Sequence, residues 1–394
     1  MTDLPDVPDL PDQDLLALDT LLSEDERAVR DRVRAFVDEH VRPHVARWYE
    51  DAHFPRELMP ELGRLGVLGM HLHDAGCPGR SAVEYGIAAL ELEAGDSGLR
   101  TAVSVQGSLA MSAISKHGSD EQKARWLPEM AAGRAVGCFG LTEPGAGSDP
   151  GSMTTTARRD GTDWVLDGRK RWIGLASLAD VAVVWARTEE GVRGFLVPTD
   201  SPGFAARPIT PKLSMRASVQ CDVDLDGVRL PADAQLPGAR GLSGPFACLN
   251  EARYGIVWGV LGAARDSYLD ALRWSLTRRQ FDRPLAGFQL TQRKLADMAV
   301  AIGKGQLLAL HLGRLKDAGR LEPHQISVGK LDNTRVALDV CREARTVLGG
   351  NGVTLEHSPL RHASNLESVR TYEGTDEVHT LVIGQRLTGI AAFR

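Results

Sequence analysis

The sequence predicts an α+β protein in three parts: a helical N-terminal domain, a small β domain and a helical C-terminal domain. Hydrophobic residues recur at helical spacing in the first third, short apolar runs separated by turn residues and prolines fill the middle, and helical spacing returns beyond Gly241. With 394 residues and 43% hydrophobic content, the chain is long enough for two or three domain-sized units. We place the boundaries at 1–136, 137–240 and 241–394.

A helix is predicted to begin at the start of the first domain. Ser23 and Glu26 form a capping-box pattern, and apolar residues at helical spacing follow from Val29 to Val37. The same spacing predicts four further helical stretches, near 56–65, 82–94, 98–115 and 120–132. The first domain is therefore expected to be all helical.

The sequence pattern in the middle of the chain predicts a β domain. Asp167-Gly168 stands between two β-prone runs, 164–166 and 169–173, and predicts a hairpin turn. Further strands are expected at 181–186, 194–197 and 221–225, and six prolines between 198 and 237 exclude a long helix. Beyond it, the segments 244–277, 290–319 and 323–348 are long enough for a four-helix bundle.

Composition and charge exclude several classes of function. A net charge of −6 gives no basic footprint, so nucleic acid is not an expected partner. The five cysteines include no C-x-x-C pair and are interpreted as free thiols in a reducing compartment. The acidic, proline-punctuated first twenty residues carry no basic targeting region, and the apolar runs are far shorter than a bilayer span. We expect a cytoplasmic protein without membrane insertion.

The pattern His71-Leu72-His73-Asp74 is the nearest approach to a metal site. It lacks an evident third ligand and reads more simply as an exposed loop. No metal is predicted.

A glycine-rich loop is predicted after a strand near residue 140. The segment 138–150 reads CFGLTEPGAGSDP and offers backbone amides and two hydroxyls to a closely approaching ligand. Such loops suit flavins and phosphates. On its glycines alone, the segment is more simply an ordinary connection between strands.

Three further motifs lie in the helical C-terminal part. Residues 278–285 read RRQFDRPL, a basic cluster that elsewhere is often a solvated helix end; Arg278 has a planar fork suited to a pyrophosphate. Residues 348–352 read LGGNG, where the absence of side chains allows close backbone approach. Residues 370–375 read RTYEGT, in which Glu373 is a candidate general base or, more simply, a helix-start residue.

Taken together, these motifs resemble the acyl-CoA dehydrogenase family over essentially the whole chain. The resemblance implies a fold with an N-terminal helical domain, a middle β-barrel or sandwich and a C-terminal four-helix bundle. It implies an oxidoreductase that is a flavoprotein with FAD, shares cofactor sites between subunits and forms a homotetramer. Electrons would leave through an electron-transfer flavoprotein.

The resemblance also implies which residues contact the cofactor. Ser148 would reach the CoA portion as well, and Trp172 would pack on the flavin ring. The implied set is Phe139, Leu141, Thr142, Gly147, Ser148, Trp172, Ile173, Gly174, Arg278, Phe281, Gln289, Leu348, Gly349, Gly350, Thr375 and Glu377. The chain departs from the family at Gly174-Leu175-Ala176, where a hydroxyl and an Asn are usual, so one hydrogen bond expected near flavin N5 is missing.

Glu373 corresponds to the family's general base, which removes the α-proton of an acyl thioester. By the same resemblance, its backbone amide and a flavin ribityl hydroxyl polarise the thioester carbonyl. A carboxylate suits this task if burial raises its pKa toward neutrality.

The segment 96–106 discriminates among substrates. A cation at Arg100, with hydroxyls at Thr101 and Ser104, resembles the carboxylate-binding motif of glutaryl-CoA dehydrogenases, whereas a plain fatty chain requires an apolar tunnel. An arginine in a surface ion pair is the simpler alternative. The segment 245–256 resembles the CoA-binding region of the same enzymes. The implied substrate-binding set is Arg100, Thr101, Ser104, Ser148, Phe246, Asn250, Arg253, Tyr372 and Gly374.

The implied reaction is oxidative decarboxylation of glutaryl-CoA to crotonyl-CoA and CO2. Alternatives that the residues leave open are desaturation without decarboxylation, and desaturation of an acyl group on a carrier protein in a biosynthetic pathway. A non-catalytic flavin-binding or scaffolding role is a third class, against which the presence of Glu373 argues.

Overall fold

The computed structural model describes residue 10 and residues 13–392. Most of the acidic N-terminal segment, including Asp3, Asp6, Asp9 and Asp12, lies outside the described residues, as does Phe393. The chain folds as two compact units. Unit 1 is formed by Met1–Ala46, Ala82–Ser97 and Ile256–Arg394, and unit 2 by Arg47–Ser81 and Gly98–Gly255.

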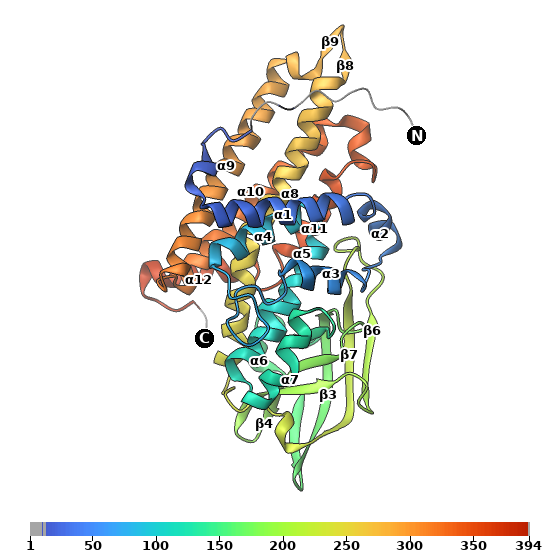
Figure 1. The fold of residues 1–394 in the computed structure, drawn as a ribbon, viewed down its shortest axis with the longest axis vertical. Helices are drawn as coiled ribbons and strands as arrows, with labels where there is room; N and C mark the ends of the chain where they lie inside the picture. Colours follow the sequence, from blue (N-terminus) through green and yellow to red (C-terminus); the bar gives the residue numbers. More distant parts are fainter. Residues whose placement is uncertain (1–9, 11–12, 393–394) are drawn as a thin grey trace. The chain divides into compact units, whose positions relative to one another are not determined.

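Unit 1 is helical (Figure 1). Its elements are η1 (Leu18–Leu21), α1 (Glu24–His40), α4 (Ala82–Gly95), β8 (Arg279–Gln280), β9 (Arg283–Pro284), η5 (Leu285–Gly287), α9 (Gln289–Asp317), α10 (Pro323–Val347), η6 (Gly349–Val353), α11 (Pro359–Val369) and α12 (Asp376–Thr388). Three helices have residues in both units, α2 (Val45–Asp51), α5 (Ser97–Ser104) and α8 (Ser243–Thr277).

The predicted start of α1 is confirmed by its capping box. Glu26 N–H donates to Ser23 Oγ over 3.2 Å, and Ser23 N–H donates to Glu26 Oε2 over 2.8 Å. The long helical segments predicted at 244–277, 290–319 and 323–348 correspond to α8, α9 and α10. Within unit 1, α10 packs against α9, α11 and α12, and α4 packs against α1 and α9.

Buried ion pairs join the helices of unit 1. Glu91 on α4 accepts hydrogen bonds from Arg34 on α1 and Arg265 on α8. Burial opposes ionisation of this carboxyl, but the two guanidinium groups prevail and hold its pKa at about 2. Asp96 accepts from Arg361 and Asn365, which fixes α11 against the end of α4. The helix that precedes the Glu373 turn is thereby anchored in the core of unit 1.

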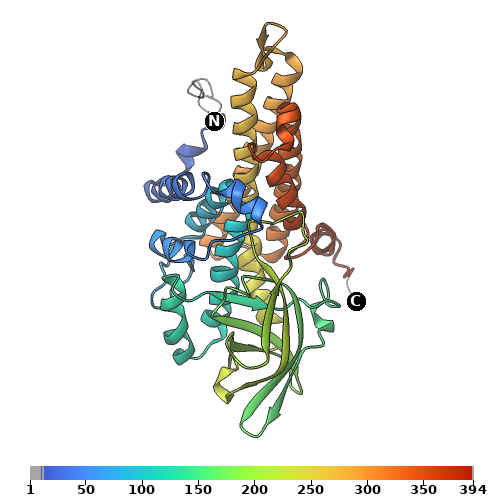
Figure 2. The ribbon, with the colours of Figure 1, turned by 90° about the vertical axis from the view of Figure 1, so that its right-hand side faces the viewer.

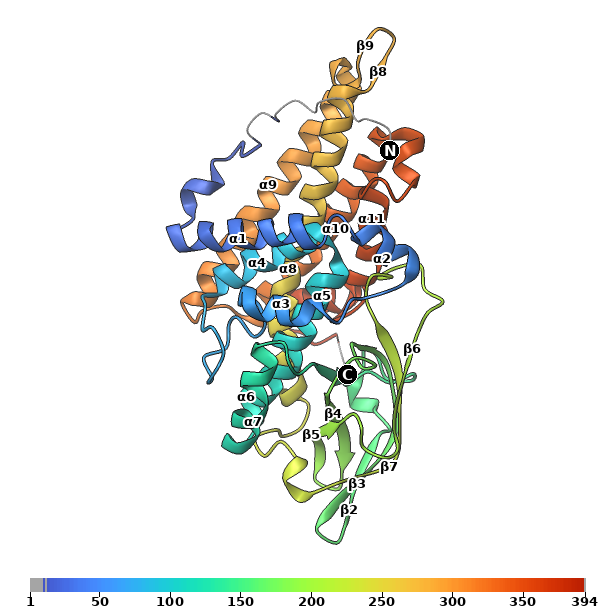
Figure 3. The same cartoon turned by 45° about the vertical axis from the view of Figure 1, so that its right-hand side comes forward.

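Unit 2 contains a seven-stranded mixed sheet and short helices (Figures 2 and 3). Its elements are α3 (Leu58–Leu65), η2 (Val105–Met111), α6 (Ser112–His117), α7 (Asp120–Ala131), β1 (Gly137–Gly140), η3 (Pro150–Ser152), β2 (Thr156–Asp160), β3 (Asp163–Gly174), β4 (Val181–Thr188), β5 (Gly191–Pro198), β6 (Phe204–Pro208), β7 (Gln220–Leu230) and η4 (Ala232–Ala234). The strand order is β1-β4-β2-β3-β7-β6, with β5 paired to β4.

The sheet encloses an apolar core and curves around it (Figure 2). Trp164, Leu166, Phe195 and Val197 are among its buried members. The expected barrel or sandwich thus takes the form of one hydrogen-bonded mixed sheet.

The helix predicted at 98–115 forms with one irregularity. Between α5 and α6 the segment η2 is a π-helix, buried along its whole length, and it packs against β1. Gln106 in η2 accepts from Gly137 N–H over 2.7 Å and donates to Met130 O and Ala135 O. π-helical segments are frequent at functional sites.

The hairpin predicted at Asp167-Gly168 is wrong. The turn lies six residues earlier, at Gly161-Thr162, where Asp160 pairs with Asp163. Asp167-Gly168 instead continues β3, where Asp167 lies opposite a bulge of Asp226-Gly227 in β7, and Asp167 Oδ1 accepts from Gly227 N–H over 2.8 Å. Asp160-Gly161 carries the same local turn signal, and pairing with β7 decided which of the two became the turn.

Among the described residues, one helix, α9, is long and apolar enough by length and composition to cross a bilayer. A single helix of this kind is weak evidence for a membrane span, because core helices pass the same test. The absence of membrane insertion stays a prediction.

Candidate active site

The turn that carries Glu373 joins α11 to α12 in unit 1. Thr375 caps α12, its Oγ1 accepting from Val378 N–H over 3.3 Å, and Glu377 lies exposed in the first turn. Glu373 has a left-handed backbone with φ of 56°, and Gly374 follows with φ of 100°. A non-glycine residue in this region costs about 1–2 kcal/mol, so the surrounding structure must hold it there.

Two side chains of α10 and one of α12 hold the turn. Lys330 Nζ donates to Tyr372 O over 2.7 Å and to Gly374 O over 2.5 Å. The imidazole of His379 lies against Gly374 so closely that a Cβ there would be 2.8 Å from Nε2, and His379 Nδ1 is 3.0 Å from Ser327 Oγ. The backbone on both sides of Glu373 is therefore fixed from α10 and α12.

An ion-pair cluster closes the base of the same turn. Asp376, buried at the start of α12, accepts from Arg335 over 3.1 Å and from Arg370 over 2.8 Å. The pKa of Arg370 is raised, first by its hydrogen bond to Asp376 and then by the charge of that carboxylate. The two ends of the 370–376 segment are thus held together.

A second group of predicted residues lies at the hairpin β8–β9. Phe281 is 89% exposed with φ of 52°, and Arg278 and Gln289 are also exposed. The Arg278 guanidinium is 5.9 Å from the Trp274 ring centroid, and Trp274 packs edge-on against His357 at 5.4 Å. These contacts link the base of the hairpin to the loop before α11.

Leu348, Gly349 and Gly350 belong to the same end of unit 1. Leu348 is buried, whereas both glycines are exposed, and a Cβ on either would meet no atom within 4 Å. Gly349 has φ of 61°. Helix α11, whose eleven residues make it about 16 Å long, separates this group from the Glu373 turn. Of the cofactor residues predicted in unit 1, Thr375 and Glu377 therefore lie beside Glu373, whereas Leu348, Gly349 and Gly350 lie beyond α11.

In unit 2, the glycine-rich loop leaves β1 after Phe139 and Gly140. Leu141 is buried, Thr142 is half-buried, and Gly147 and Ser148 are exposed. A Cβ on Gly145 or Gly147 would meet open space. The loop thus presents backbone and hydroxyl groups to a ligand without obstruction.

Glu143 and Lys170 anchor that loop. Glu143 accepts from Thr154 N–H over 2.6 Å, from Thr155 N–H over 3.0 Å and from Lys170 Nζ over 2.8 Å, and Lys170 Nζ also donates to Leu141 O over 3.1 Å. Burial opposes ionisation of Glu143, but the hydrogen bond from Lys170 and the Thr154 N–H hold its pKa at about 2. Both ends of the loop are therefore tied to β3.

The end of β3 lies beside the loop. Arg171 N–H donates to Thr142 O over 2.9 Å, and Trp172, with φ of 64°, exposes half of its side chain, while Ile173 is buried. Gly174 approaches Val105 of η2. The Gly-rich loop, Trp172 and η2 are thus brought together within unit 2. A half-exposed indole next to the residue that bonds this loop can pack against a flat aromatic ring such as a flavin.

The segment predicted to recognise the acyl chain lies on α5, directly before η2. Arg100 is 1%, Thr101 8% and Ser104 1% exposed, so the alternative of a surface arginine is wrong. Arg100 and Ser104 are four residues apart and share one face of the helix. Ser104 Oγ is buried and makes no hydrogen bond within the described part of the chain.

The segment predicted to bind CoA forms the first part of α8 in unit 2. Phe246 is 38% exposed, and Arg253 Nη1 donates to Asn250 Oδ1 over 3.2 Å. Glu251 is paired with Lys116 of α6 at 3.1 Å. This part of α8 is therefore tied to the helices of unit 2.

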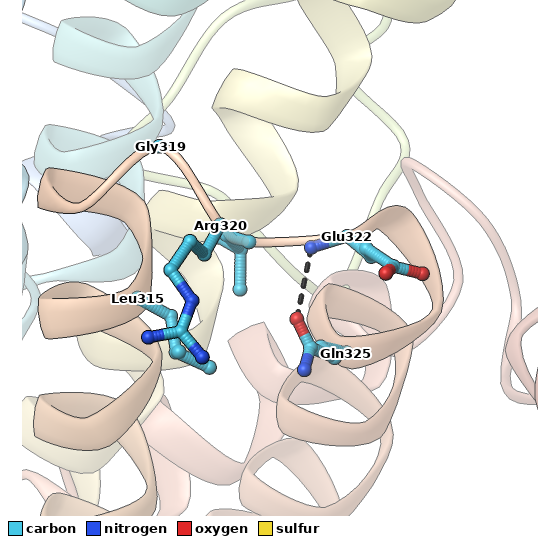
Figure 4. A pocket seen from close by; sticks show the side chains of 6 residues that line it. Leu315, Gly319, Arg320, Glu322 and Gln325 are labelled. Atoms are coloured by element: carbon cyan, nitrogen blue, oxygen red, sulfur yellow. Dashed lines mark hydrogen bonds between the residues drawn. The ribbon is translucent and has the colours of Figure 1, made fainter.

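A surface pocket at the turn between α9 and α10 contains none of the predicted site residues. Arg320, Glu322 and Gln325 line it, and Glu322 N–H donates to Gln325 Oε1 over 2.9 Å (Figure 4). That hydrogen bond belongs to the capping of α10. Among the described residues, no group of three or more His, Cys, Asp or Glu side chains could hold a metal ion.

Sequence reasoning missed Lys330 and the Glu143–Lys170 pair. Lys330 and Ser327 lie one turn apart on α10, and both are buried although polar. In the sequence, the local signal is a pair of polar residues at helical spacing. The partners of Lys330 lie 42 and 44 residues away along the chain, so this spacing could not predict them.

Family models and curated relatives indicate the same family for this chain. Residues 23–134, 138–228 and 239–388 match the models of the N-terminal, middle and C-terminal domains of acyl-CoA dehydrogenase. The mitochondrial short-chain specific acyl-CoA dehydrogenase of Bos taurus is 34% identical over 93% of this chain and 90% of its own length.

Solved structures agree. A glutaryl-CoA dehydrogenase from Mycobacterium smegmatis in complex with FADH2 is 61% identical, covers 96% of this chain and 98% of that chain, and has a TM-score of 0.95. A chain of the electron transferring flavoprotein structure of Acidaminococcus fermentans is 30% identical over 93% of this chain and 98% of that chain, with a TM-score of 0.89. The chain therefore belongs to the acyl-CoA dehydrogenase family, and FAD is its cofactor.

Proposed function

We propose that this acyl-CoA dehydrogenase converts glutaryl-CoA to crotonyl-CoA and CO2, with two electrons passed to an acceptor. The observation that carries the proposal is the buried Arg100 on α5, with Ser104 on the same helix face. A guanidinium presents a planar fork of donors that matches a carboxylate in two parallel hydrogen bonds. An acyl chain that ends in a methyl group has no acceptor with which this cation could pair.

The comparisons support the same substrate. The M. smegmatis protein that is named a glutaryl-CoA dehydrogenase shares 61% of its residues with this chain, against 34% for the short-chain enzyme of Bos taurus. The short-chain relatives favour a second candidate, desaturation of an acyl-CoA without decarboxylation.

In the proposed reaction, the Glu373 carboxylate takes the α-proton of the thioester, and the Glu373 N–H binds the carbonyl oxygen on which negative charge develops. FAD, when bound, supplies the two-electron oxidation by accepting the β-hydride. Arg100 binds the distal carboxylate, which leaves as CO2 after the α,β double bond has formed. The γ-carbanion that remains takes back the proton held by Glu373, so that glutaryl-CoA, as its carboxylate, loses CO2 and one hydride overall to become crotonyl-CoA.

The assembly and the electron acceptor belong to the same proposal. The exposed Phe281 and Arg278 at the β8–β9 hairpin suit contact with FAD held by a neighbouring subunit in a homotetramer. The neighbour described as an electron transferring flavoprotein structure supports a flavoprotein of that class as acceptor.

The test is incubation of the FAD-loaded protein with glutaryl-CoA and an artificial electron acceptor, followed by mass spectrometry of the thioesters. Crotonyl-CoA together with an equal amount of CO2 is the expected result. Accumulated glutaconyl-CoA would identify the second candidate instead. No product from glutaryl-CoA, with rapid bleaching of the flavin by butyryl-CoA, would exclude a dicarboxylic substrate.

A further inference from the structure

Lys330 is a buried residue of α10 whose hydrogen bonds bracket Glu373. Its side chain is 1% exposed, and Nζ donates to the carbonyl oxygens of Tyr372 and Gly374, the residues directly before and after Glu373. We propose that Lys330 is a positioning residue that orients and polarises the Tyr372–Glu373 peptide, so that the Glu373 N–H binds the thioester carbonyl oxygen. The inference rests on the proposed role of Glu373.

The first step of the inference rests on the planarity of the peptide bond. The Tyr372 carbonyl and the Glu373 N–H belong to one trans peptide unit, in which the C=O and N–H bonds point in opposite directions. A donor held 2.7 Å from Tyr372 O therefore sets the direction of the Glu373 N–H, which points away from Lys330. The lysine acts on the opposite side of the peptide from the proposed oxyanion.

The second step concerns the strength of the N–H donor. Hydrogen bonds arranged in a chain polarise one another, and this effect grows where the surroundings exclude water. Donation by Lys330 to the carbonyl oxygen withdraws electrons from the peptide and makes its N–H a stronger donor. Because the proposed oxyanion forms only as the α-proton leaves, a donor fixed beforehand stabilises the transition state more than the bound substrate.

The third step concerns the backbone of Glu373 itself. Its φ of 56° is unfavourable for a residue with a Cβ, and a free turn would relax away from it. The second hydrogen bond, from Lys330 Nζ to Gly374 O, locks the following peptide as well. His379 fills the space beside Gly374, where a Cβ would be 2.8 Å from its Nε2. The peptides on both sides of Glu373 are thus held by the same lysine.

The test uses a glutaryl-CoA analogue whose β-methylene is replaced by sulfur and whose thioester carbonyl carries ¹³C. This analogue can lose its α-proton but cannot donate a β-hydride. With the FAD-loaded Lys330→Met variant, we expect the isotope-edited carbonyl stretch to move from the bound wild-type value toward its value in water. Exchange of the α-protons with deuterated water should slow by about 10²-fold, because misplacing the N–H donor and the carboxylate base lowers the rate of proton transfer by about that factor.

A surface arginine of the same helix supplies the matched control. Arg342 pairs with Glu367 and is 55% exposed, so Arg342→Met removes a cation from α10 without touching the 372–374 backbone. Its carbonyl frequency and exchange rate should equal those of the wild type. If Lys330→Met fails to retain FAD, Lys330→Gln, which keeps an N–H donor of similar reach, should show a smaller shift in the same direction.

The outcomes separate this inference from the proposed function. Glu373→Gln should abolish α-proton exchange; if exchange continues, the role of Glu373 as base is wrong. If Glu373→Gln is inactive but both Lys330 variants keep the wild-type carbonyl frequency and exchange rate, the base role stands and the role of Lys330 is overturned. A purely structural lysine would alter FAD content or unfolding without moving the carbonyl frequency.

Discussion

Gly174 at the end of β3 faces Val105 of the π-helical segment η2 so closely that a Cβ on Gly174 would lie 3.1 Å from Val105 Cγ2. That separation is tighter than ordinary van der Waals contact, so a side chain at 174 requires Val105 to move. Residue 174, where this chain departs from the family pattern, therefore packs against Val105 in the helical segment that follows Arg100.

Replacing Gly174 by Thr should destabilise unit 2 by about 1–3 kcal/mol, because it overpacks the contact with Val105. Gly174→Ala should cost less. The double variant Gly174→Thr with Val105→Ala should lose less stability than the sum of the losses of the two single variants, by about 0.5–3 kcal/mol in the free energy of unfolding. Chemical denaturation of the four proteins measures this coupling, and strictly additive losses would show that Val105 does not limit the side chain at 174.

Removing the guanidinium of Arg100 should distinguish dicarboxylic from monocarboxylic substrates. Arg100→Met should lower kcat/KM for glutaryl-CoA by about 10²-fold, since hydrogen bonds to a charged group contribute about 1.5–3 kcal/mol. The same variant should keep most of its activity on butyryl-CoA, which serves as the internal control. Equal losses on both substrates would reject a carboxylate-binding role for Arg100.

The Glu143–Lys170 pair should make unit 2 sensitive to acid. Because the folded-state pKa of Glu143, about 2, lies below the usual value of 4.5, its carboxylate stabilises the fold fully above pH 4.5, and this contribution of about 3 kcal/mol is lost as the pH falls toward 2. Glu143→Gln should be less stable at pH 6, and the difference should shrink on acidification. Urea unfolding between pH 3 and pH 6 tests this; a difference independent of pH would mean that Glu143 is not the titrating group.

Arg278 should contribute to FAD retention through its charge. Arg278→Ala is expected to weaken FAD binding by about 10- to 100-fold, consistent with loss of one charge-assisted contact to a phosphate. The control is Arg273→Ala, which removes an exposed arginine near the end of α8, the helix that Arg278 directly follows, and lies outside the predicted site. FAD release during dialysis and the sedimentation coefficient should be measured together. Equal FAD retention by both variants would remove Arg278 from the cofactor site.

Local sequence signals determined most of the helical framework. The Ser23–Glu26 capping box and the apolar spacing behind it gave α1, and α8, α9 and α10 appeared where the helical period continued over 25 residues or more. These elements are predictable because caps and periodicity act between residues three or four apart. The candidate base, the glycine-rich loop and Arg100 were also found from short motifs.

Contacts between distant residues decided the rest. Asp160-Gly161 and Asp167-Gly168 carry the same turn signal, and only pairing with β7 kept the second inside β3 and left the first as the turn. The burial of Arg100 depends on tertiary packing around α5, which no local pattern contains. The sequence by itself indicated which residues are proposed to carry the chemistry. Only the tertiary structure decided how Glu373 is held, because its left-handed backbone depends on hydrogen bonds from Lys330 on another helix.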